Sequence, residues 1–547
     1  MNEQSPNKVW LPLALFSLLA LGLYLGMRIE GRQLRQHSPA SRKLISRPGK
    51  LDEILGYIDA RYMDKVNRQE LEEAAIQAML EKLDPHSIYI TAEDMQDVEE
   101  QMSGEFEGIG IEFQLLDDTV VVITPLSGSP AEEVGILSGD KIITIDDNLI
   151  AGQGLSSSEI VRQLKGSKDS KVKIGLLRYG LDSLLQLTLT RAQIPIHSVD
   201  AAYVIEPQTA YIKLNRFSAN AYTEFMEALD SLVEQHQVKN LLLDLRDNPG
   251  GYLPEATKLL NQFFTEKDIL LLYTEGAQSI RKEYKTHGRA LFPLEKIAVL
   301  INEGSASASE IVAGALQDQD RGIIVGRRSF GKGLVQEQYQ LADGSALRLT
   351  VAHYYTPSGR CIQKPYTSQA DYDQDLAHRY ENGELFHADS IKLQDTVQYY
   401  TREGREVHGG GGIVPDIFVP LDSISFDEDL SKMRSQITPF IIRHLLPNGA
   451  HHYSLPQRPE EFVRTQLEPD LWNDFLAFAK QQGVNLSSTK EQKLRPYLLR
   501  WLKAGIARQL FGNKVYFQVL NADDPDVQAA LQAIKTEHLN TSTSNPD

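Results

Sequence analysis

The sequence contains a single cysteine, Cys361, among 547 residues. One thiol excludes an intramolecular disulfide framework and any zinc site built from several cysteines. Basic residues are also scarce, because 56 Lys and Arg stand against 74 Asp and Glu, and the formal net charge is −18. A dedicated nucleic-acid-binding protein needs a basic field to neutralise phosphates, so we expect no nucleic-acid partner. The length suggests about three or four domains.

Only one long apolar run occurs, Val9–Met27, which carries no charge. Its length is close to the thickness of the bilayer core, so it predicts an uncleaved membrane anchor. A cleaved signal peptide is the first alternative, but no A-x-A-like site follows Met27, and a buried core helix is the second. The basic residues that follow the run favour a cytoplasmic position for the rest of the chain.

The rest of the sequence divides into regions with different hydrophobic patterns. Apolar residues recur at helical spacing from Leu51 to Leu83, and a helix there should end before Asp84-Pro85. Short strands and turns fill about Gly104–Arg191, and the chain after about Asp427 is patterned as separate helices. Between them strands alternate with helices, which predicts a largely parallel sheet. The expected strands are Ala210–Leu214, Leu241–Leu245, Ile297–Ile301 and Gly322–Val325, and the expected helices are Ala219–Gln235, Pro254–Phe264 and Ala306–Gln317.

The most unusual segment is Gly304–Glu310, which reads Gly-Ser-Ala-Ser-Ala-Ser-Glu directly after an apolar strand. A strand that enters a helix through small residues can expose a nucleophilic hydroxyl near the helix N-terminus, where backbone N–H groups favour developing negative charge. The alternative needs no chemistry, because the segment from Ser307 to Glu310 also fits the S-x-x-E capping box. Spacing alone does not choose among the three serines.

A serine nucleophile requires a base, and Lys332 is a candidate. No G-x-S-x-G motif surrounds Ser307, and none of the 13 histidines lies in a recognisable site sequence. A lysine acts as a base when desolvation leaves its amine neutral. In an extended segment Lys332 and Gln336 share a face, so Gln336 could hydrogen-bond and orient the amine. A solvated loop lysine is the alternative. A P-loop is excluded, because Gly333 stands where the motif needs Ser or Thr for Mg²⁺.

Two glycine-rich segments complete the candidates. In Asp244–Gly251 the paired Gly250 and Gly251 would let backbone N–H groups approach a ligand closely, as an oxyanion hole requires, although an ordinary strand-to-helix turn is the alternative. Gly108-Ile109-Gly110-Ile111 can offer consecutive N–H groups to the terminal carboxylate of a peptide, while the adjacent strand edge pairs with that peptide. A plain glycine-rich hairpin is the alternative there.

Together these segments resemble the carboxyl-terminal processing (tail-specific) serine proteases from about Leu51 to Pro420. Gly108–Ile111 and Gly135–Asp140 are similar to the PDZ domain of that family. Asp244–Gly251 matches its D-L-R-x-N-x-G-G motif. Ser305–Glu310 matches its S-A-S-A-S-E motif, and Phe330–Gln336 matches its F-G-K-G-x-x-Q motif.

The resemblance implies a role for each candidate residue. Ser307 would be the nucleophile, Lys332 the general base and Gln336 the residue that positions it. The backbone N–H groups of Ala308 and of Gly250 or Gly251 would form the oxyanion hole. Substrate tails would bind at Gly108, Ile109, Gly110 and Ile111, and no metal or other cofactor is implied.

The implied fold is an α/β, crotonase-like (ClpP/crotonase) protease core with an inserted PDZ domain, a helical cap and a helical C-terminal extension. The expected divisions are an anchor at 1–30, a linker and cap at 31–103, the PDZ domain at 104–191, the protease core at 192–426 and the extension at 427–547.

The function implied is that of a serine endopeptidase that recognises substrate C-termini through its PDZ domain and cleaves exported proteins with a Ser/Lys dyad. A PDZ-containing peptide-binding protein with an inactive protease core is the alternative. Against the charge bias noted above, the resemblance also implies an inner-membrane protein with a single-pass anchor and its catalytic body in the periplasm. Whether copies of the chain form a homo-oligomer stays open.

Overall fold

The computed structural model describes residues 49–366, 372–393, 395, 397–445, 453–467 and 469–536. The predicted anchor, Val9–Met27, lies outside these residues. Within them, no helix is both long and apolar enough to cross a membrane. Helix α16 (Ser488–Phe511), for example, has 24 residues, but lysine, arginine and glutamate side chains occur along its whole length. The predicted localisation in the inner membrane is corrected accordingly, because the structure gives a single-pass anchor no support.

The chain divides into two compact units, up to Met79 and from Leu80 onward. The first contains α2 (Lys50–Arg61) and nearly all of α3 (Arg68–Leu80). The helical pattern therefore ends three residues earlier than the predicted Leu83. In the second unit Asp84 Oδ1 accepts the N–H groups of His86 (2.8 Å) and Ser87 (2.9 Å), which fixes a turn at Asp84-Pro85.

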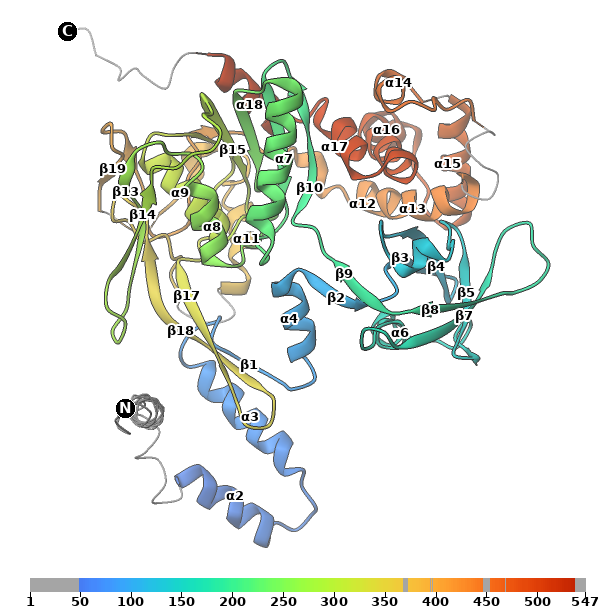
Figure 1. Ribbon diagram of the computed structural model, residues 1–547, viewed down its shortest axis with the longest axis horizontal. Coiled ribbons are helices and arrows are strands. Elements are labelled where there is room, and N and C mark those ends of the chain that lie inside the picture. The colour runs from blue at the N-terminus through green and yellow to red at the C-terminus, as the bar shows by residue number, and fades with distance from the viewer. Residues whose placement is uncertain are drawn as a thin grey trace, which may run out of the picture. The chain divides into compact units, whose positions relative to one another are not determined.

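The first region of the second unit holds a small β-sheet domain with its own buried core. Its strands follow the order β3-β4-β5-β7-β8, with β6 paired to β5, so β3 lies at an edge. A two-stranded ribbon of β2 and β9 connects the domain to the rest of the unit (Figure 1). The elements of this part of the chain, of which β1 and α4 precede the small domain, are β1 (Ile88–Ile90), α4 (Met95–Ser103), β2 (Glu105–Gly108), β3 (Ile111–Leu116), β4 (Thr119–Pro125), α5 (Pro130–Glu133), β5 (Lys141–Ile145), β6 (Asn148–Leu149), α6 (Ser157–Leu164), β7 (Lys171–Leu177), β8 (Leu185–Thr190) and β9 (Ala192–Pro195).

A second sheet, in the order β10-β11-β12-β15-β16-β21, is parallel except where β10 pairs with β11. The strand from Asn240 to Asp244 is flanked by two parallel neighbours, as its unbroken Leu-Leu-Leu run predicts. Its elements are β10 (Val199–Glu206), β11 (Thr209–Leu214), α7 (Ala221–His236), β12 (Asn240–Asp244), α8 (Leu253–Leu260), β15 (Lys296–Ile301), α9 (Ala308–Asp318), β16 (Ile323–Gly326) and β21 (Ile417–Phe418).

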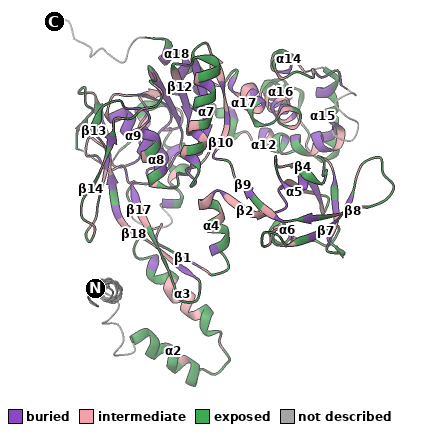
Figure 2. Ribbon diagram, in the orientation of Figure 1, coloured by how far each residue is buried: buried purple, intermediate pink, exposed green. Residues whose placement is uncertain are grey.

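Alternate residues of this sheet enter two different cores. Leu241 and Leu243 belong to the core that includes residues of α7, α8 and α9. Leu242, between them, belongs to a core shared with Val527 and Leu531 of α18 (Pro525–Lys535). In Figure 2 the strands are accordingly buried while the outer faces of the helices are exposed. The last helix of the chain is therefore part of this α/β layer structure, whereas the sequence pattern indicated separate helices.

An antiparallel sheet, β1-β18-β13-β14 with β17 on β18, lies beside this core. The hairpin β13–β14 of this sheet was not among the predicted strands. The elements are β13 (Lys267–Glu275), β14 (Lys282–His287), β17 (Leu334–Gln340), β18 (Ala346–Tyr355), α11 (Asp375–Glu381), η2 (Ala388–Ser390), β19 (Tyr399–Tyr400), β20 (Glu406–Val407) and η3 (Ser423–Phe426).

The remaining helices surround a fourth, largely aromatic and aliphatic core that contains Trp472 and Phe440. They are α12 (Glu428–Ser435), α13 (Ile437–Phe440), the π-helical turn η4 (Ile441–Leu445), α14 (Pro459–Arg464), α15 (Pro469–Gln481), α16 and α17 (Asn513–Asn521). Helix α17 then contacts β10, where Asn521 donates a hydrogen bond to Tyr203 Oη at 2.8 Å.

Candidate active site

Three candidate loops meet at one edge of the parallel sheet. They follow β12, β15 and β16, which are adjacent and parallel, so their carboxyl ends point the same way. Ligands of open α/β sheets bind outside the carboxyl ends of the strands. The sheet therefore brings the Asp244–Gly251, Gly304–Glu310 and Phe330–Gln336 segments together.

Ser307 is the N-cap residue of α9 and has φ 54° and ψ −112°. A positive φ is costly for a residue with a Cβ, so the surrounding contacts must hold this conformation. The backbone carbonyl of Ser307 accepts a hydrogen bond from Tyr354 Oη at 3.1 Å, and its N–H donates to Glu310 Oε2 at 2.8 Å. The serine is half-buried, whereas the rest of the helix entrance is buried.

The two flanking serines are engaged elsewhere. Ser305 Oγ donates to the carbonyl of Leu245 at 2.8 Å, and Ser309 Oγ donates to the carbonyl of Asn248 at 2.9 Å. Both serines have no exposed surface. Of the three hydroxyls that spacing left open, only that of Ser307 belongs to a residue with access to a substrate.

Glu310 connects the serine loop to the lysine loop. Its Oε2 accepts the N–H groups of Ser307 (2.8 Å) and Lys332 (2.9 Å), and its Oε1 accepts the N–H of Gly331 (2.7 Å) and the hydroxyl of Ser329 (2.6 Å). The side chain is fully buried, and burial raises the pKa of its carboxyl despite these hydrogen bonds. Half of the capping box is thus present, but the same carboxylate also fixes the backbone of Lys332. The sequence signal for Glu310 was the capping pattern, which gave no hint of this second role.

Lys332 Nζ donates a hydrogen bond to Gln336 Oε1 at 2.9 Å. Gln336 in turn donates through Nε2 to the backbone carbonyl of His86. Burial lowers the pKa of Lys332, and the charge of Arg348 adds to this effect. No hydrogen bond between Ser307 Oγ and Lys332 Nζ occurs among the described side chains. Catalytic hydrogen bonds are often formed only in the substrate complex.

His86 lies close enough to Lys332 for the two charges to interact. Burial and the charge of Lys332 lower the pKa of His86 to about 4. Its Nε2 is 2.6 Å from the hydroxyl of Tyr372. The imidazole is therefore neutral near pH 7 and adds no positive charge to the site.

The glycine loop lies directly against Ser307. A Cβ added to Gly250 (φ 98°) would be 2.8 Å from both Ser307 Cβ and the Ala308 nitrogen. The N–H of Gly250 donates to Asn248 Oδ1 at 2.9 Å, whereas no described acceptor takes the N–H of Gly251 or Ala308. Asn248 also receives the Ala306 N–H at 3.0 Å and so joins the glycine and serine loops. Sequence reasoning did not select Asn248 or Tyr354 as site residues.

The peptide-binding candidates span the junction of two strands: Gly108 ends β2, Ile109 and Gly110 lie between the strands, and Ile111 begins β3. Gly110 has φ 76°, and a Cβ there would come within 2.2 Å of Ser129 Cβ, so only glycine fits. Ser129 Oγ donates to the Gly110 carbonyl at 3.0 Å. Among the hydrogen bonds of the described residues, none uses the N–H of Ile109 or Gly110. These donors lie beside the edge strand β3, the geometry that binding of a peptide C-terminus by strand addition requires.

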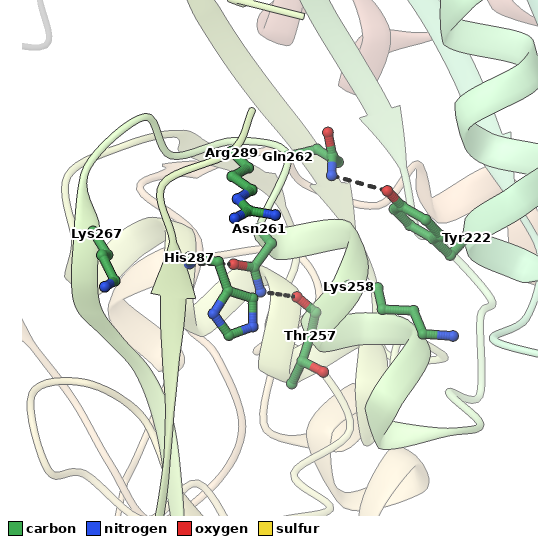
Figure 3. Close-up of a pocket in the computed structure, with 8 residues that line it drawn as sticks. All are labelled: Tyr222, Thr257, Lys258, Asn261, Gln262, Lys267, His287 and Arg289. Atoms are coloured by element: carbon green, nitrogen blue, oxygen red, sulfur yellow. Dashed lines mark hydrogen bonds between the residues drawn. The ribbon is translucent and has the colours of Figure 1, made fainter. Parts of the chain in front are cut away.

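A hollow of about 520 Å³ lies at the opposite end of α8 (Figure 3). The glycine loop precedes the first residue of α8, whereas the hollow is lined by residues of its last turn, about 12 Å away at 1.5 Å per residue. None of the residues that line it belongs to the candidate site. They are Tyr222, Thr257, Lys258, Asn261, Gln262, Lys267, His287 and Arg289.

A serine with positive φ at a helix N-terminus, a lysine whose pKa is lowered by burial and a separate small β-sheet domain are typical of the class of serine peptidases that carry an accessory PDZ module. Sequence comparisons identify the family. The profile of peptidase family S41 matches residues 208–373, that of the PDZ domain 108–189, and that of the activating protease CtpB N-terminal domain 19–94.

Individual relatives agree with this assignment. The chain is 34% identical over 390 residues to the carboxy-terminal-processing protease of Bartonella bacilliformis, covering 71% of this chain and 88% of the relative. It is 35% identical to CtpB of Bacillus subtilis, covering 58% of this chain and 65% of the relative. A solved photosystem II D1 C-terminal processing protease is 28% identical and covers 68% of this chain and 86% of that one, at a TM-score of only 0.35. The chain belongs to the carboxy-terminal processing proteases of family S41, so the predicted family is confirmed.

Proposed function

We propose that the protein is a serine endopeptidase that uses Ser307 as its nucleophile and Lys332 as its general base, on a core of the crotonase-like type. The observation that carries the proposal is the buried Glu310 carboxylate, one oxygen of which holds the N–H groups of both residues. A structural cap of α9 would need only the first of these two bonds. Gln336 then orients the lysine amine.

The chemistry follows from the arrangement. The neutral amine of Lys332 takes the proton of Ser307 Oγ as that oxygen bonds to the substrate carbonyl carbon. The ammonium then protonates the leaving amine when the C–N bond breaks, which leaves an acyl-enzyme. A water molecule that loses its proton to Lys332 attacks the ester, and the proton returns to Ser307 Oγ as the product acid departs. The free N–H groups of Ala308 and Gly251 supply oxyanion donors, and Gly250 adds a third if its bond to Asn248 opens.

Substrate selection is assigned to the PDZ module. Its Gly108–Ile111 loop offers unpaired N–H groups to a terminal carboxylate, and the edge strand β3 offers backbone partners to the preceding residues. A protein with an unstructured, apolar C-terminal tail is therefore the proposed substrate.

The test is cleavage of such a protein by four single variants of the full chain. We expect Ser307→Ala and Lys332→Ala to abolish cleavage while the fold is retained. Ser231→Ala and Lys267→Ala change exposed residues of the same core and should leave activity unchanged. Wild-type activity in either dyad variant would exclude the dyad.

The second candidate is a PDZ-containing binding protein whose protease core is inactive. It is favoured by one observation, that the Lys332 amine is hydrogen-bonded to Gln336 and not to Ser307. A serine-directed fluorophosphonate separates the two candidates. Covalent labelling of Ser307 supports the peptidase, whereas tail binding without labelling at any pH supports the binding protein.

A further inference from the structure

The C-terminal segment reaches the candidate active site through two acidic residues at the start of α18. Asp524 is the N-cap of this helix, and its Oδ1 accepts the Val527 N–H at 3.1 Å. Both Asp524 Oδ2 (2.9 Å) and Asp526 Oδ2 (3.0 Å) also accept from Arg246 Nη1. These three side chains lie at the junction of the parallel sheet with the last helix.

Arg246 belongs to the glycine loop. The other edge of its guanidinium contacts Asp244, the last residue of β12, through Nη2 at 2.7 Å. Its own N–H donates to Asp244 Oδ1 at 3.0 Å. The guanidinium is only 14% exposed. The path of the chain from β12 toward Gly250 is therefore fixed by a nearly buried arginine, two of whose three carboxylate partners come from the C-terminal segment.

Asp526 also contacts the lysine loop directly and the serine loop through Arg327. Its Oδ1 accepts from Arg327 Nη1 at 3.3 Å, and Arg327 Nε donates to Glu303 Oε2 at 3.0 Å. Arg327 directly follows β16 and begins the segment that leads to Lys332, whereas Glu303 directly precedes the Gly304–Glu310 segment. One carboxylate is thus bonded to the glycine loop and the lysine loop, and through Arg327 to the serine loop.

The ion-pair network of Arg246, Arg327, Asp524 and Asp526 costs folding free energy if one of its partners is missing. Asp526 and Arg327 are about as buried as core residues, with side chains 7% and 8% exposed. Removing one partner of a buried ion pair leaves an uncompensated charge in a low-dielectric site. The apolar residues of α18 already attach the helix to the sheet, so attachment does not require two charged side chains at this edge.

We propose that Asp524 and Asp526 are positioning residues, through which the C-terminal segment holds the three active-site loops in their relative places. The proposal rests on the function assigned to this edge of the sheet. It gives the segment beyond residue 427 a task inside the protease core.

The test uses the full chain with Asp524→Asn, Asp526→Asn and the double variant. Asparagine keeps the N-cap of α18 and removes the charge. Asp523→Asn is the matched control, because Asp523 is exposed and precedes the helix. Leu531→Ala weakens the packing of α18 without touching either arginine, so it reports a merely structural role of the helix.

Two readouts are required. Steady-state cleavage of a tailed protein substrate should show kcat lowered about tenfold to hundredfold in the double variant, with KM within about twofold, because small misplacements of reacting groups are costly. Hydrogen exchange should increase in residues 245–251 and 303–308 while 525–535 stays protected. Asp526→Glu should recover part of kcat.

Wild-type kcat and exchange in the double variant would overturn the proposal. It would also be overturned if Leu531→Ala, at an equal loss of thermal stability, lowered kcat by the same factor. If the wild-type protein cleaves nothing, the proposed function fails, but the exchange measurement still decides whether the acidic pair positions the loops.

Discussion

Replacement of Glu310 by glutamine tests the central contact of the proposed site. The carboxylate accepts four hydrogen bonds at 2.6–2.9 Å. An amide accepts only through its oxygen, so its NH₂ group would face either the N–H groups of Ser307 and Lys332 or the hydroxyl of Ser329 and the N–H of Gly331. Glu310→Gln therefore loses two hydrogen bonds in the first orientation, whereas in the second it loses that of Gly331 and the Ser329 hydroxyl can turn to accept from the amide.

The upper limit of the effect follows from the loss of two bonds in the first orientation. A hydrogen bond to a charged group contributes about 1.5–3 kcal/mol, so the loss is about 3–6 kcal/mol at most. The neutral amide recovers part of this, because burying the carboxylate itself costs free energy. Since the same bonds fix the backbone of the nucleophile and of the base, we expect kcat to fall about 100-fold or more.

The assay combines kcat for a tailed substrate with hydrogen exchange of residues 305–312 and 329–333. Glu255→Gln is the matched control, because Glu255 is 4% exposed and accepts from Tyr222 N–H and Lys258 outside the site. Faster exchange in both segments and a lower kcat should occur in Glu310→Gln alone. An unchanged kcat in Glu310→Gln, or an equal fall in both variants, would refute the reasoning.

Three further predictions concern neighbouring residues. Gly250→Ala places a Cβ 2.8 Å from the nitrogen of residue 308 and should abolish labelling by a fluorophosphonate. Gly404→Ala is the control, because Gly404 has a similar φ of 89° but open space around it, and this variant should still be labelled. Equal labelling of the two variants would contradict the steric argument. Gln336→Glu puts a negative charge beside the amine of Lys332, raises its pKa and should move the rising limb of kcat to higher pH; an unmoved pH profile excludes this contact. His86 has a pKa lowered from 6.5 to about 4, so the unfolded chain binds more protons between these values and stability falls as pH falls through them. The full pKa shift corresponds to about 3 kcal/mol of folding stability, which solvent screening reduces to about 1–2 kcal/mol. Denaturant unfolding of the wild-type protein at pH 7 and pH 4.5 should show this difference in stability, and His86→Gln should remove it.

The strands of the parallel sheet could be predicted because their burial on both faces leaves continuous apolar runs. Ile297–Ile301 and Leu241–Leu245, for example, lie within one residue of β15 and β12. The hairpin β13–β14 was missed, although β13 contains a continuous apolar run, Ile269–Tyr273. Its partner β14 has a single apolar residue, Tyr284, among charged and polar ones. Local pattern alone does not separate such strands from loops.

The sequence predicted the residues of the candidate site and the contact between Lys332 and Gln336, but not the contacts that join the loops to one another. The motifs named Ser307, Lys332 and Gln336, which lie within 30 positions of one another. The contacts of Asp526 with Arg246 and Arg327 join residues 280 and 199 positions apart, and no local periodicity reports such distances. Likewise, Glu310 has the sequence signal of a helix cap, and only the fold brings the N–H of Lys332 to the carboxylate oxygen that also accepts the N–H of Ser307.

The two-sided covering of the parallel sheet has a consequence for biosynthesis. Helices α7 to α9 are made together with the strands, but α18 lies 199 residues beyond Arg327, its partner next to β16. At about 5–20 residues per second, a ribosome needs about 10–40 s to make that stretch. During this interval the second face of the sheet lacks the apolar cover of α18, and Arg246 and Arg327 have Asp244 and Glu303 as partners but not yet Asp524 and Asp526. A nascent chain thus completes the contacts of Arg246 and Arg327 at the candidate site only after α18 has left the ribosome.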